Sequence, residues 1–331
     1  MLAMGVRAFG PAKTIEPLDV EKPTPKPGEA IVSVRFAGVN HVDIAMRNGV
    51  FAKSAGLKTS LPLVLGMEAS GEVQSIGADV EDLKAGDRVA YCLSFGSYAE
   101  YAAVPAWRLV KVPDDVPLDV ATALMLQGST AHYLTTSAFP LREGDVALVH
   151  AGAGGVGQLL IQLARIAGAV VIATVGGAQD KGAIARSRGA AHVVYRDNGE
   201  DFQKAVMEIT SGAGANVVYD GIGKETIAGS LRSVARRGVL VSLGQASGPI
   251  EHISPQELGE QGSIFFTRPH LADYLREKAE VSARAKDLFD LYLAGRLAVP
   301  VDRVYPLDGA GEAHGVLEGR KARGKILLKV V

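Results

Sequence analysis

A glycine-rich hexapeptide, Gly152 to Gly157, carries the clearest chemical signal in this chain of 331 residues. Gly152, Gly154 and Gly157 match the pattern G-x-G-x-x-G, which lets a backbone turn tightly and approach a pyrophosphate closely. The pattern lies between an expected strand at 145–150 and an expected helix at 155–167, whose N-terminal N–H groups favour phosphate. The hexapeptide therefore predicts a dinucleotide-binding turn. The alternative is an ordinary strand-to-helix turn with close helix packing at Gly157.

The residues after the next expected strand, 170–175, indicate which dinucleotide fits. NAD sites usually place Asp or Glu at this tip, about 20 residues beyond the glycines, to bind the ribose 2′-hydroxyl. Here the tip is Gly176, and the cations Lys181 and Arg196 follow along the chain. A missing carboxylate beside cations favours a 2′-phosphate, and hence NADPH. Against this, Asp180 adjoins Lys181, and both cations could be ordinary surface residues.

The elements around the glycine motif alternate between strand and helix. Apolar runs predict strands at 145–150, 170–175, 192–195, 216–220 and 238–243. Amphipathic segments predict helices at 155–167, 181–188, 201–210 and 226–235. Such alternation is typical of a doubly wound parallel sheet of the Rossmann type, so the fold class is α/β.

The flanking regions differ from this α/β core. The first third is β-rich, with an alternating strand at 29–36 and short strands at 72–76 and 87–91, and a helical stretch follows at 120–138. The last segments predict a strand at 263–267, a helix at 281–293, and strands at 304–306 and 325–331. The chain is therefore expected to return to its first domain, with the Rossmann unit inserted in a β-rich domain.

Segments along nearly the whole chain resemble the medium-chain dehydrogenase/reductase superfamily, and within it the zinc-independent, zeta-crystallin-like quinone oxidoreductases. The matching segments are 37–40 with Asp43, 66–71, 84–89, 126–133, 150–157, 218–220, 266–269 and 324–326. The resemblance implies a GroES-like catalytic domain of residues 1–125 and 265–331 and a Rossmann NADPH-binding domain of residues 126–264. It also implies a homodimer joined through the cofactor-domain sheets near 263–267.

The resemblance assigns roles to individual residues. Asn40 and Gln127 become the catalytic candidates beside the nicotinamide and the acceptor, and Ala45 joins them in the substrate site. The residues expected to bind NADPH are Asn40, Thr130, Gly152, Gly154, Gly155, Val156, Gly157, Gly176, Lys181, Tyr195, Leu243, Gly244, Gln245, Phe265, Phe266, Thr267 and Arg320. The alternative for Asn40, Gln127 and Glu68 is that they are buried polar residues that satisfy backbone groups.

Zinc is not expected. The zinc-dependent relatives place a Cys close to position 40 and a His after Gly66, where this chain has Asn40 and Met67. His41 and Glu68 remain, but two potential ligands without a thiolate make a poor zinc site. Glu68 is instead expected to be a buried acceptor that organises the site.

The sequence also departs from the family where the substrate is expected. Members commonly carry a Tyr two residues after Asp43, and this chain has Ala45. The loop 51–60 is likewise unlike the usual Pro- and Tyr-rich stretch. A smaller side chain at position 45 predicts a wider or more apolar mouth to the substrate site.

Composition limits the remaining function classes. The formal net charge is −1, which shows no nucleic-acid footprint, and the single cysteine, Cys92, excludes an internal disulfide. No apolar run reaches the ~20 residues of a membrane span, and the first 13 residues do not resemble a signal peptide. A cytoplasmic protein that acts on a small molecule is therefore expected.

Together these observations predict hydride transfer from NADPH to a quinone, without zinc, in the cleft between the domains. The first alternative is an NADPH-dependent reductase of enones, alkenals or enoyl thioesters. The second is a non-catalytic protein that binds NADPH or RNA.

Overall fold

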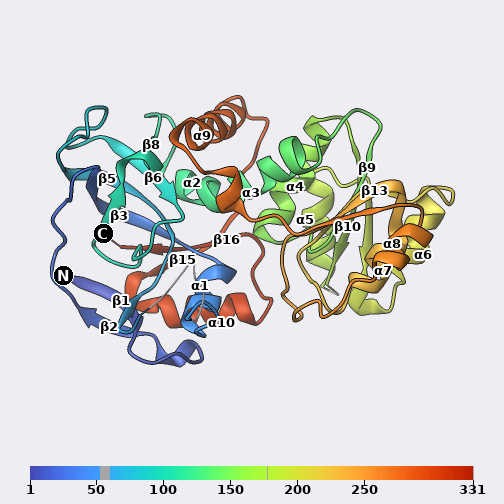
Figure 1. Ribbon diagram of the computed structural model, residues 1–331, viewed down its shortest axis with the longest axis horizontal. Coiled ribbons are helices and arrows are strands. Elements are labelled where there is room, and N and C mark those ends of the chain that lie inside the picture. The colour runs from blue at the N-terminus through green and yellow to red at the C-terminus, as the bar shows by residue number, and fades with distance from the viewer. Residues whose placement is uncertain (53–59, 177, 331) are drawn as a thin grey trace. The chain divides into compact units, whose positions relative to one another are not determined.

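The computed structural model describes residues 1–52, 60–176 and 178–330, so residues 53–59 of the unusual loop lie outside the described part. The chain divides into two compact units. Unit 1 comprises Met1–Ser129 and Leu275–Val331, and unit 2 comprises Thr130–Tyr274. In Figure 1, unit 1 therefore holds both ends of the colour scale and unit 2 its middle.

Unit 1 is built on β-sheets. The strands of its larger sheet are β3 (Glu29–Val39), β5 (Glu68–Ile76), β6 (Arg88–Cys92), β7 (Tyr101–Pro105), β8 (Val110–Lys111), β15 (Val301–Pro306) and β16 (Lys325–Lys329). Their order is β15-β16-β3-β5-β6-β8, with β7 paired to β3. A smaller sheet has the order β2-β1-β4, formed by β1 (Leu2–Val6), β2 (Glu16–Asp19) and β4 (Leu63–Val64). Because β16 and β5 both run antiparallel to β3, the end of β3 adjoins the starts of both.

The helices of unit 1 pack around these sheets. They are α1 (His41–Arg47), α2 (Leu118–Ala123), α9 (Lys278–Leu293) and α10 (Ala310–Glu318). The core gathers apolar residues from both ends of the sequence, among them Val32, Val34, Leu307 and Leu328. Unit 1 therefore requires the C-terminal segment to complete its core.

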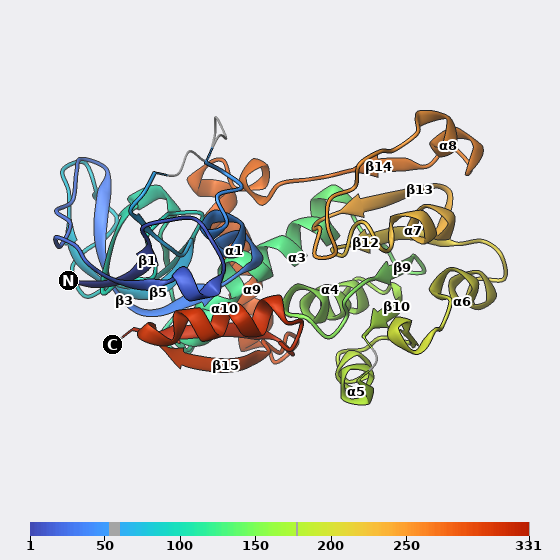
Figure 2. The same ribbon diagram turned by 90° about the horizontal axis from the view of Figure 1, so that it is seen from below.

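Unit 2 contains one parallel sheet. Its strands are β9 (Val146–Val149), β10 (Val170–Val175), β11 (His192–Tyr195), β12 (Ala215–Asp220), β13 (Val234–Ser242) and β14 (Phe265–Thr267). Their order is β11-β10-β9-β12-β13-β14, and every neighbouring pair is parallel. The helices are α4 (Gly155–Ile166), α5 (Gln179–Ser187), α6 (Phe202–Ile209), α7 (Ile227–Ser233) and α8 (Pro255–Glu260). They lie on both faces of the sheet (Figure 2), and this burial explains apolar runs such as that of β10.

The helical stretch expected at 120–138 is a succession of short pieces. After α2 comes a π-helical turn at Leu124–Gly128, then α3 (Ser129–Tyr133), then a second π-helical turn at Leu134–Ala138. Apolar periodicity predicts the helix but not these turns, which widen the helix by one residue and often accompany functional sites. No helix among the described residues is long and apolar enough to cross a membrane.

The predicted α/β class with a Rossmann-type parallel sheet is confirmed. One strand begins earlier than expected, because β13 begins at Val234 rather than at Gly238, and residues 234 and 235 belong to it rather than to the preceding helix. Arg237, with a φ of 60°, lies in the part of β13 where its register with β12 shifts. Residues 265–267 form β14 in the sheet of unit 2, whereas the sequence-based ranges gave them to the first domain. The ranges 1–125, 126–264 and 265–331 otherwise stay a prediction.

Candidate functional site

The turn between β9 and α4 is built for close backbone packing. Ala151 has a φ of 53°, and the Gly154 N–H donates to its carbonyl oxygen at 2.9 Å. A Cβ at Gly157 would lie 2.3 Å from that oxygen, so a side chain there would push the helix away from the turn. Gly152 and Gly154 lie in the turn, and Gly155, Val156 and Gly157 are the first residues of α4. Among the described residues no side chain caps α4, so its N-terminus can present backbone N–H groups to a phosphate.

The end of β10 brings together three of the residues expected at a 2′-phosphate. Gly176 follows the strand, and a Cβ there would lie 3.4 Å from Lys181 Nζ and 2.9 Å from Asp197 Oδ2. Tyr195 ends β11, and its hydroxyl accepts a hydrogen bond from Arg186 at 3.2 Å. One basic side chain, Lys181, and one carboxylate, Asp197, therefore lie close to a position without a side chain of its own, and a second basic residue, Arg186, contacts Tyr195.

Three further cofactor candidates of unit 2, Leu243, Gly244 and Gln245, lie just beyond the carboxyl end of β13, whereas Thr130 lies in α3. Leu243 follows β13 and donates its N–H to Asp220 O at 2.8 Å. A Cβ at Gly244 would lie 2.7 Å from Gly221 O, so this glycine allows the segments after β12 and β13 to touch. Gln245 is exposed, and Thr130, at the start of unit 2, is half-buried. These segments form the edge where parallel sheets bind nucleotides.

The edge strand β14 presents its residues unequally. Phe265 is 62% exposed, whereas Phe266 packs partly against the core of unit 2 and Thr267 is half-buried. Arg320 belongs to unit 1, where it is exposed just after α10 with a φ of 55°. Its expected contact with the cofactor therefore stays a prediction.

A buried polar cluster lies directly beneath the glycine turn. His150 Nδ1 lies 2.8 Å from Thr174 Oγ1, and His150 Nε2 lies 3.0 Å from Ser230 Oγ. Ser230 in turn donates to Asp220 at 2.7 Å. Burial lowers the pKa of His150 to about 4, so the ring is neutral at neutral pH. The cluster joins the ends of β9, β10 and β12 to α7, and thereby supports the turn above it.

In unit 1, the catalytic candidate Asn40 lies at the junction of β3 and α1. Its backbone N–H donates to Asp43 Oδ2 at 2.8 Å, which caps α1. Its side-chain Nδ2 donates to Glu68 Oε2 at 2.9 Å, and its Oδ1 accepts from Lys325 Nζ at 2.7 Å. Lys325 also forms an ion pair with Glu68. The Asn40 amide is thus held by protein groups, and Ala45 lies half-buried on the helix that Asn40 caps.

Gln127 lies in the first π-helical turn and is half-buried. The Leu126 N–H, one residue earlier, donates to Glu68 Oε1 at 2.5 Å. Glu68 therefore contacts both regions that carry the catalytic candidates. The expectation that Glu68 is a buried acceptor agrees with these contacts. Lys325 is one of several basic residues near the C-terminus, and its side chain is completely buried.

Asp43 continues this network away from Asn40. Tyr98 donates its hydroxyl to Asp43 Oδ2 at 3.2 Å and lies 3.1 Å from His314 Nε2. His314 Nδ1 faces Arg47 at 3.2 Å, and because Arg can only donate, Nδ1 accepts and Nε2 carries the proton. Burial raises the pKa of Asp43 to about 7 and lowers that of His314 to about 3. Asp43 Oδ1 is buried and has no hydrogen-bond partner among the residues that the structure describes.

Sequence reasoning missed this network, because its members come from distant parts of the chain. Arg47 and His314 are 267 residues apart, and Arg47 also pairs with Glu318 at 2.5 Å. The one local signal is the Asn40–Asp43 spacing, which suits a helix cap with an acidic third residue. No sequence pattern links Tyr98 to either end.

Groups of three or more potential ligands, His, Cys, Asp or Glu, that could hold a metal are absent from the described residues. Cys92 is buried, and burial raises the pKa of its thiol. A reactive thiolate at this position is therefore not favoured.

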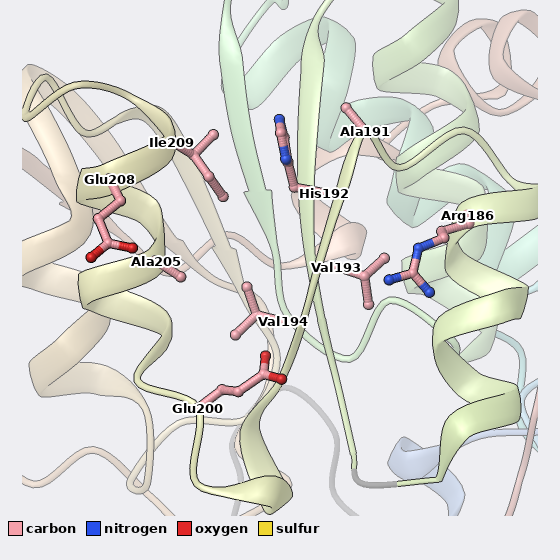
Figure 3. Close-up of a pocket in the computed structure, with 9 residues that line it drawn as sticks. All are labelled: Arg186, Ala191, His192, Val193, Val194, Glu200, Ala205, Glu208 and Ile209. Carbon is pink, nitrogen blue, oxygen red and sulfur yellow. The ribbon is translucent and has the colours of Figure 1, made fainter.

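Figure 3 shows a groove on unit 2, and no residue of the glycine turn lines it. It is lined by β11 and by side chains from α5 and α6: Arg186, Ala191, His192, Val193, Val194, Glu200, Ala205, Glu208 and Ile209. Its volume is about 380 Å³, but it contains none of the predicted site residues.

Comparison with known proteins identifies a family model for a large part of each unit. Residues 26–114 match the family model described as an alcohol dehydrogenase GroES-like domain, and residues 155–283 match the model described as a zinc-binding dehydrogenase. A probable quinone oxidoreductase of Schizosaccharomyces pombe is 36% identical over 328 residues, covering 99% of this chain and 96% of that protein. The chain belongs to the quinone oxidoreductase family of the medium-chain dehydrogenase/reductase superfamily.

Two further comparisons bear on chemistry within this superfamily. This chain is similar to the crystal structure of Escherichia coli quinone oxidoreductase complexed with NADPH. The TM-score is 0.94 and the identity is 33%, and the match covers 100% of each chain. A 2-haloacrylate reductase of a Burkholderia species is 38% identical, covering 94% of this chain and 93% of that protein. The predicted family, with its GroES-like and Rossmann parts, is confirmed. The individual site residues stay predictions.

Proposed function

We propose that this protein is an NADPH:quinone oxidoreductase that works without zinc. The observation that carries the cofactor assignment is the end of β10, where Gly176 supplies no carboxylate of its own and the Lys181 ammonium lies close by, together with the side chain of Asp197. The glycine turn fits a pyrophosphate, because side chains at Gly157 or Gly152 would clash with the turn or the sheet. The relatives named quinone oxidoreductases, one of them solved with NADPH, support the same assignment.

When bound, the cofactor supplies a hydride from its reduced nicotinamide. The residues of this chain bind, orient and shield. The turn before α4 would hold the pyrophosphate, and Lys181 and Tyr195 would hold the 2′-phosphate. Asn40 and Gln127 would orient the nicotinamide and the acceptor, and would stabilise the charge that develops on an acceptor oxygen.

The absence of zinc is supported by the side chains near Asn40. Glu68, one of the two potential ligands, is paired with Lys325, and Met67 is fully apolar at the position where zinc-dependent relatives place a His. A cytoplasmic location stays a prediction. A homodimer joined through β14 also stays one, and the exposed Phe265 on that edge strand is compatible with it.

Activity with a paired substrate panel tests the proposal. Cofactor oxidation is followed at the nicotinamide absorbance. With quinones as acceptors it should be fast when NADPH is the donor, and slower when NADH is the donor. Turnover of enones or 2-haloacrylates alone would shift the function to reduction of activated carbon–carbon double bonds. That second candidate is favoured by the 38% identity to a 2-haloacrylate reductase and by the small side chain of Ala45. NADPH binding without turnover of any acceptor would favour a non-catalytic role.

Replacing Gly176 with Asp should reverse the cofactor preference. The new carboxylate would stand about where the 2′-phosphate is expected, since a Cβ at this position lies 3.4 Å from Lys181 Nζ. Loss of a charged hydrogen bond costs about 1.5–3 kcal/mol, so the Kd for NADPH should rise roughly 10- to 150-fold, while the Kd for NADH should not.

Gly176→Ala is the matched control, because it adds the same Cβ without charge. Its nearest neighbour, Asp197 Oδ2, is the end of a side chain that can move. Equal weakening of NADPH binding in both variants would indicate a steric effect and would contradict the assignment of a 2′-phosphate site.

A further inference from the structure

Three polar side chains meet at one end of the large sheet of unit 1. Asn40 follows β3, Glu68 begins β5 and Lys325 begins β16, and these three strands are neighbours in the sheet. The side chains of Glu68 and Lys325 are completely buried, and Asn40 is 4% exposed. Gly38 makes room for them, because a Cβ there would lie 1.9 Å from Glu68 Oε2 and 2.8 Å from Lys325 Nζ.

The two oxygens of Glu68 have different partners. Oε2 accepts from Asn40 Nδ2 and from Lys325, whereas Oε1 accepts from the Leu126 N–H. Leu126 lies in the π-helical turn that also carries Gln127. One carboxylate therefore connects the two segments that hold the catalytic candidates.

The arrangement also fixes the orientation of the Asn40 amide. Glu68 accepts from the amide nitrogen, and Lys325 donates to the amide oxygen. If the amide were rotated by half a turn, its oxygen would face the Glu68 carboxylate and its nitrogen would face the Lys325 ammonium. Both contacts would be repulsive. A buried ion pair is by itself weak evidence for a role in stability. Replacing a buried ion pair by uncharged residues of similar volume is often neutral or stabilising.

We infer that the Glu68–Lys325 pair positions Asn40 and the Gln127 turn for hydride transfer. This inference rests on the proposed function, and assigns Glu68 and Lys325 as positioning residues that act through Asn40 and the Leu126 backbone. Neither Glu68 nor Lys325 is proposed to contact the reacting atoms. The contribution of the pair is geometric, and a misplacement of about 1 Å at a reacting group can reduce a rate by roughly 100-fold.

The double variant Glu68→Gln with Lys325→Met tests this inference. It removes both charges together, so neither is left unpaired in the core, and it keeps nearly the same volume. We expect kcat to fall about 10- to 100-fold. The Kd for NADPH should change much less than kcat, because the residues expected at the pyrophosphate and the 2′-phosphate lie in unit 2 and are untouched. With NADPH deuterated at the transferred position, the isotope effect on kcat should rise as hydride transfer becomes more rate-limiting.

A double-mutant cycle separates positioning from a general structural role. If the pair acts through Asn40, the double variant should lower kcat much less in an Asn40→Ala background than in the wild type. The control is Ser70→Ala with Thr122→Val, which removes a buried hydrogen bond of 2.7 Å between β5 and α2 without touching Asn40. This control should leave kcat within twofold of the wild type.

Hydrogen exchange provides a readout that needs no turnover. Amides at 124–128 should exchange faster in the Glu68→Gln, Lys325→Met variant than in the wild type, because Leu126 loses its charged acceptor. Unchanged exchange, or additive effects with Asn40→Ala, would overturn the positioning role. Absence of quinone turnover in the wild type would instead overturn the proposed function, and the cycle would then be run with the acceptor that the wild type reduces.

Discussion

Replacing Arg47 with Met should lower the free energy of unfolding of unit 1 by about 3 kcal/mol. The Arg47 side chain has no exposed surface, and it donates to Glu318, to His314 Nδ1 and to Gly10 O. Met fills most of the same volume but donates nothing, so the buried acceptors on His314 and Gly10 lose their partner. Glu318 is partly exposed and can be hydrated, which keeps the cost at the lower end of the range for broken buried pairs.

Urea unfolding measures this effect. Trp107 is the single tryptophan of the chain and lies in unit 1, so its fluorescence follows that unit. Arg35→Met is the control, because Arg35 makes a half-exposed pair with Glu72 at 3.4 Å, and its loss should cost less than about 1 kcal/mol. Equal losses in the two variants would show that the buried network around Arg47 contributes no more than a surface pair.

The parts of the fold that follow from local sequence were predictable. The apolar run of β10 and the glycines before α4 can each be recognised from a few neighbouring residues. The structure forms a strand at the first and the start of a helix at the second. The tip at Gly176 is equally local, because the residue after a buried strand is fixed once the strand is found. These features define the parallel sheet and the cofactor candidates of unit 2.

The parts that depend on distant segments were not predictable. Lys325 reads as one of several cations near the C-terminus, and only its pairing across 257 residues with Glu68 shows why it is buried. The π-helical turn before Ser129 is another case, since apolar spacing is the same for a regular helix. Residue 265 was given to the wrong unit because a three-residue strand carries too little pattern to show which sheet it joins.

The same contrast explains what sequence reasoning found at Asn40. The family resemblance identifies the residue, but it leaves open whether the amide is free for a ligand. In the structure, the Asn40 amide is hydrogen-bonded to Glu68 and Lys325. The fold therefore fixes the orientation of this amide and does not leave it unpaired.

Replacing Asp43 with Asn should make the free energy of unfolding fall less than in the wild type as the pH is raised from 5 to 8. Burial raises the pKa of Asp43 from 3.8 to about 7. Between these values the folded state keeps a proton that the unfolded state has lost, so the wild type loses about 1.4 kcal/mol per pH unit as pH rises through this range. From pH 5 to pH 8 the loss is roughly 3 kcal/mol, and it is complete once pH exceeds the folded pKa. Asn cannot ionise, so the variant should gain that amount relative to the wild type.

Trp107 fluorescence in urea at pH 5 and pH 8 tests this sign. Asn can still accept from the Asn40 N–H and from the Tyr98 hydroxyl, as Asp43 Oδ2 does, so its structural cost should be similar at both pH values. Asp114→Asn, at a fully exposed carboxylate of unit 1, should show no such change. Tyr98→Phe removes a hydrogen bond that favours ionised Asp43, so the loss of stability should extend to higher pH. If the difference between Asp43→Asn and the wild type were equal at pH 5 and pH 8, burial would not be holding a proton on Asp43.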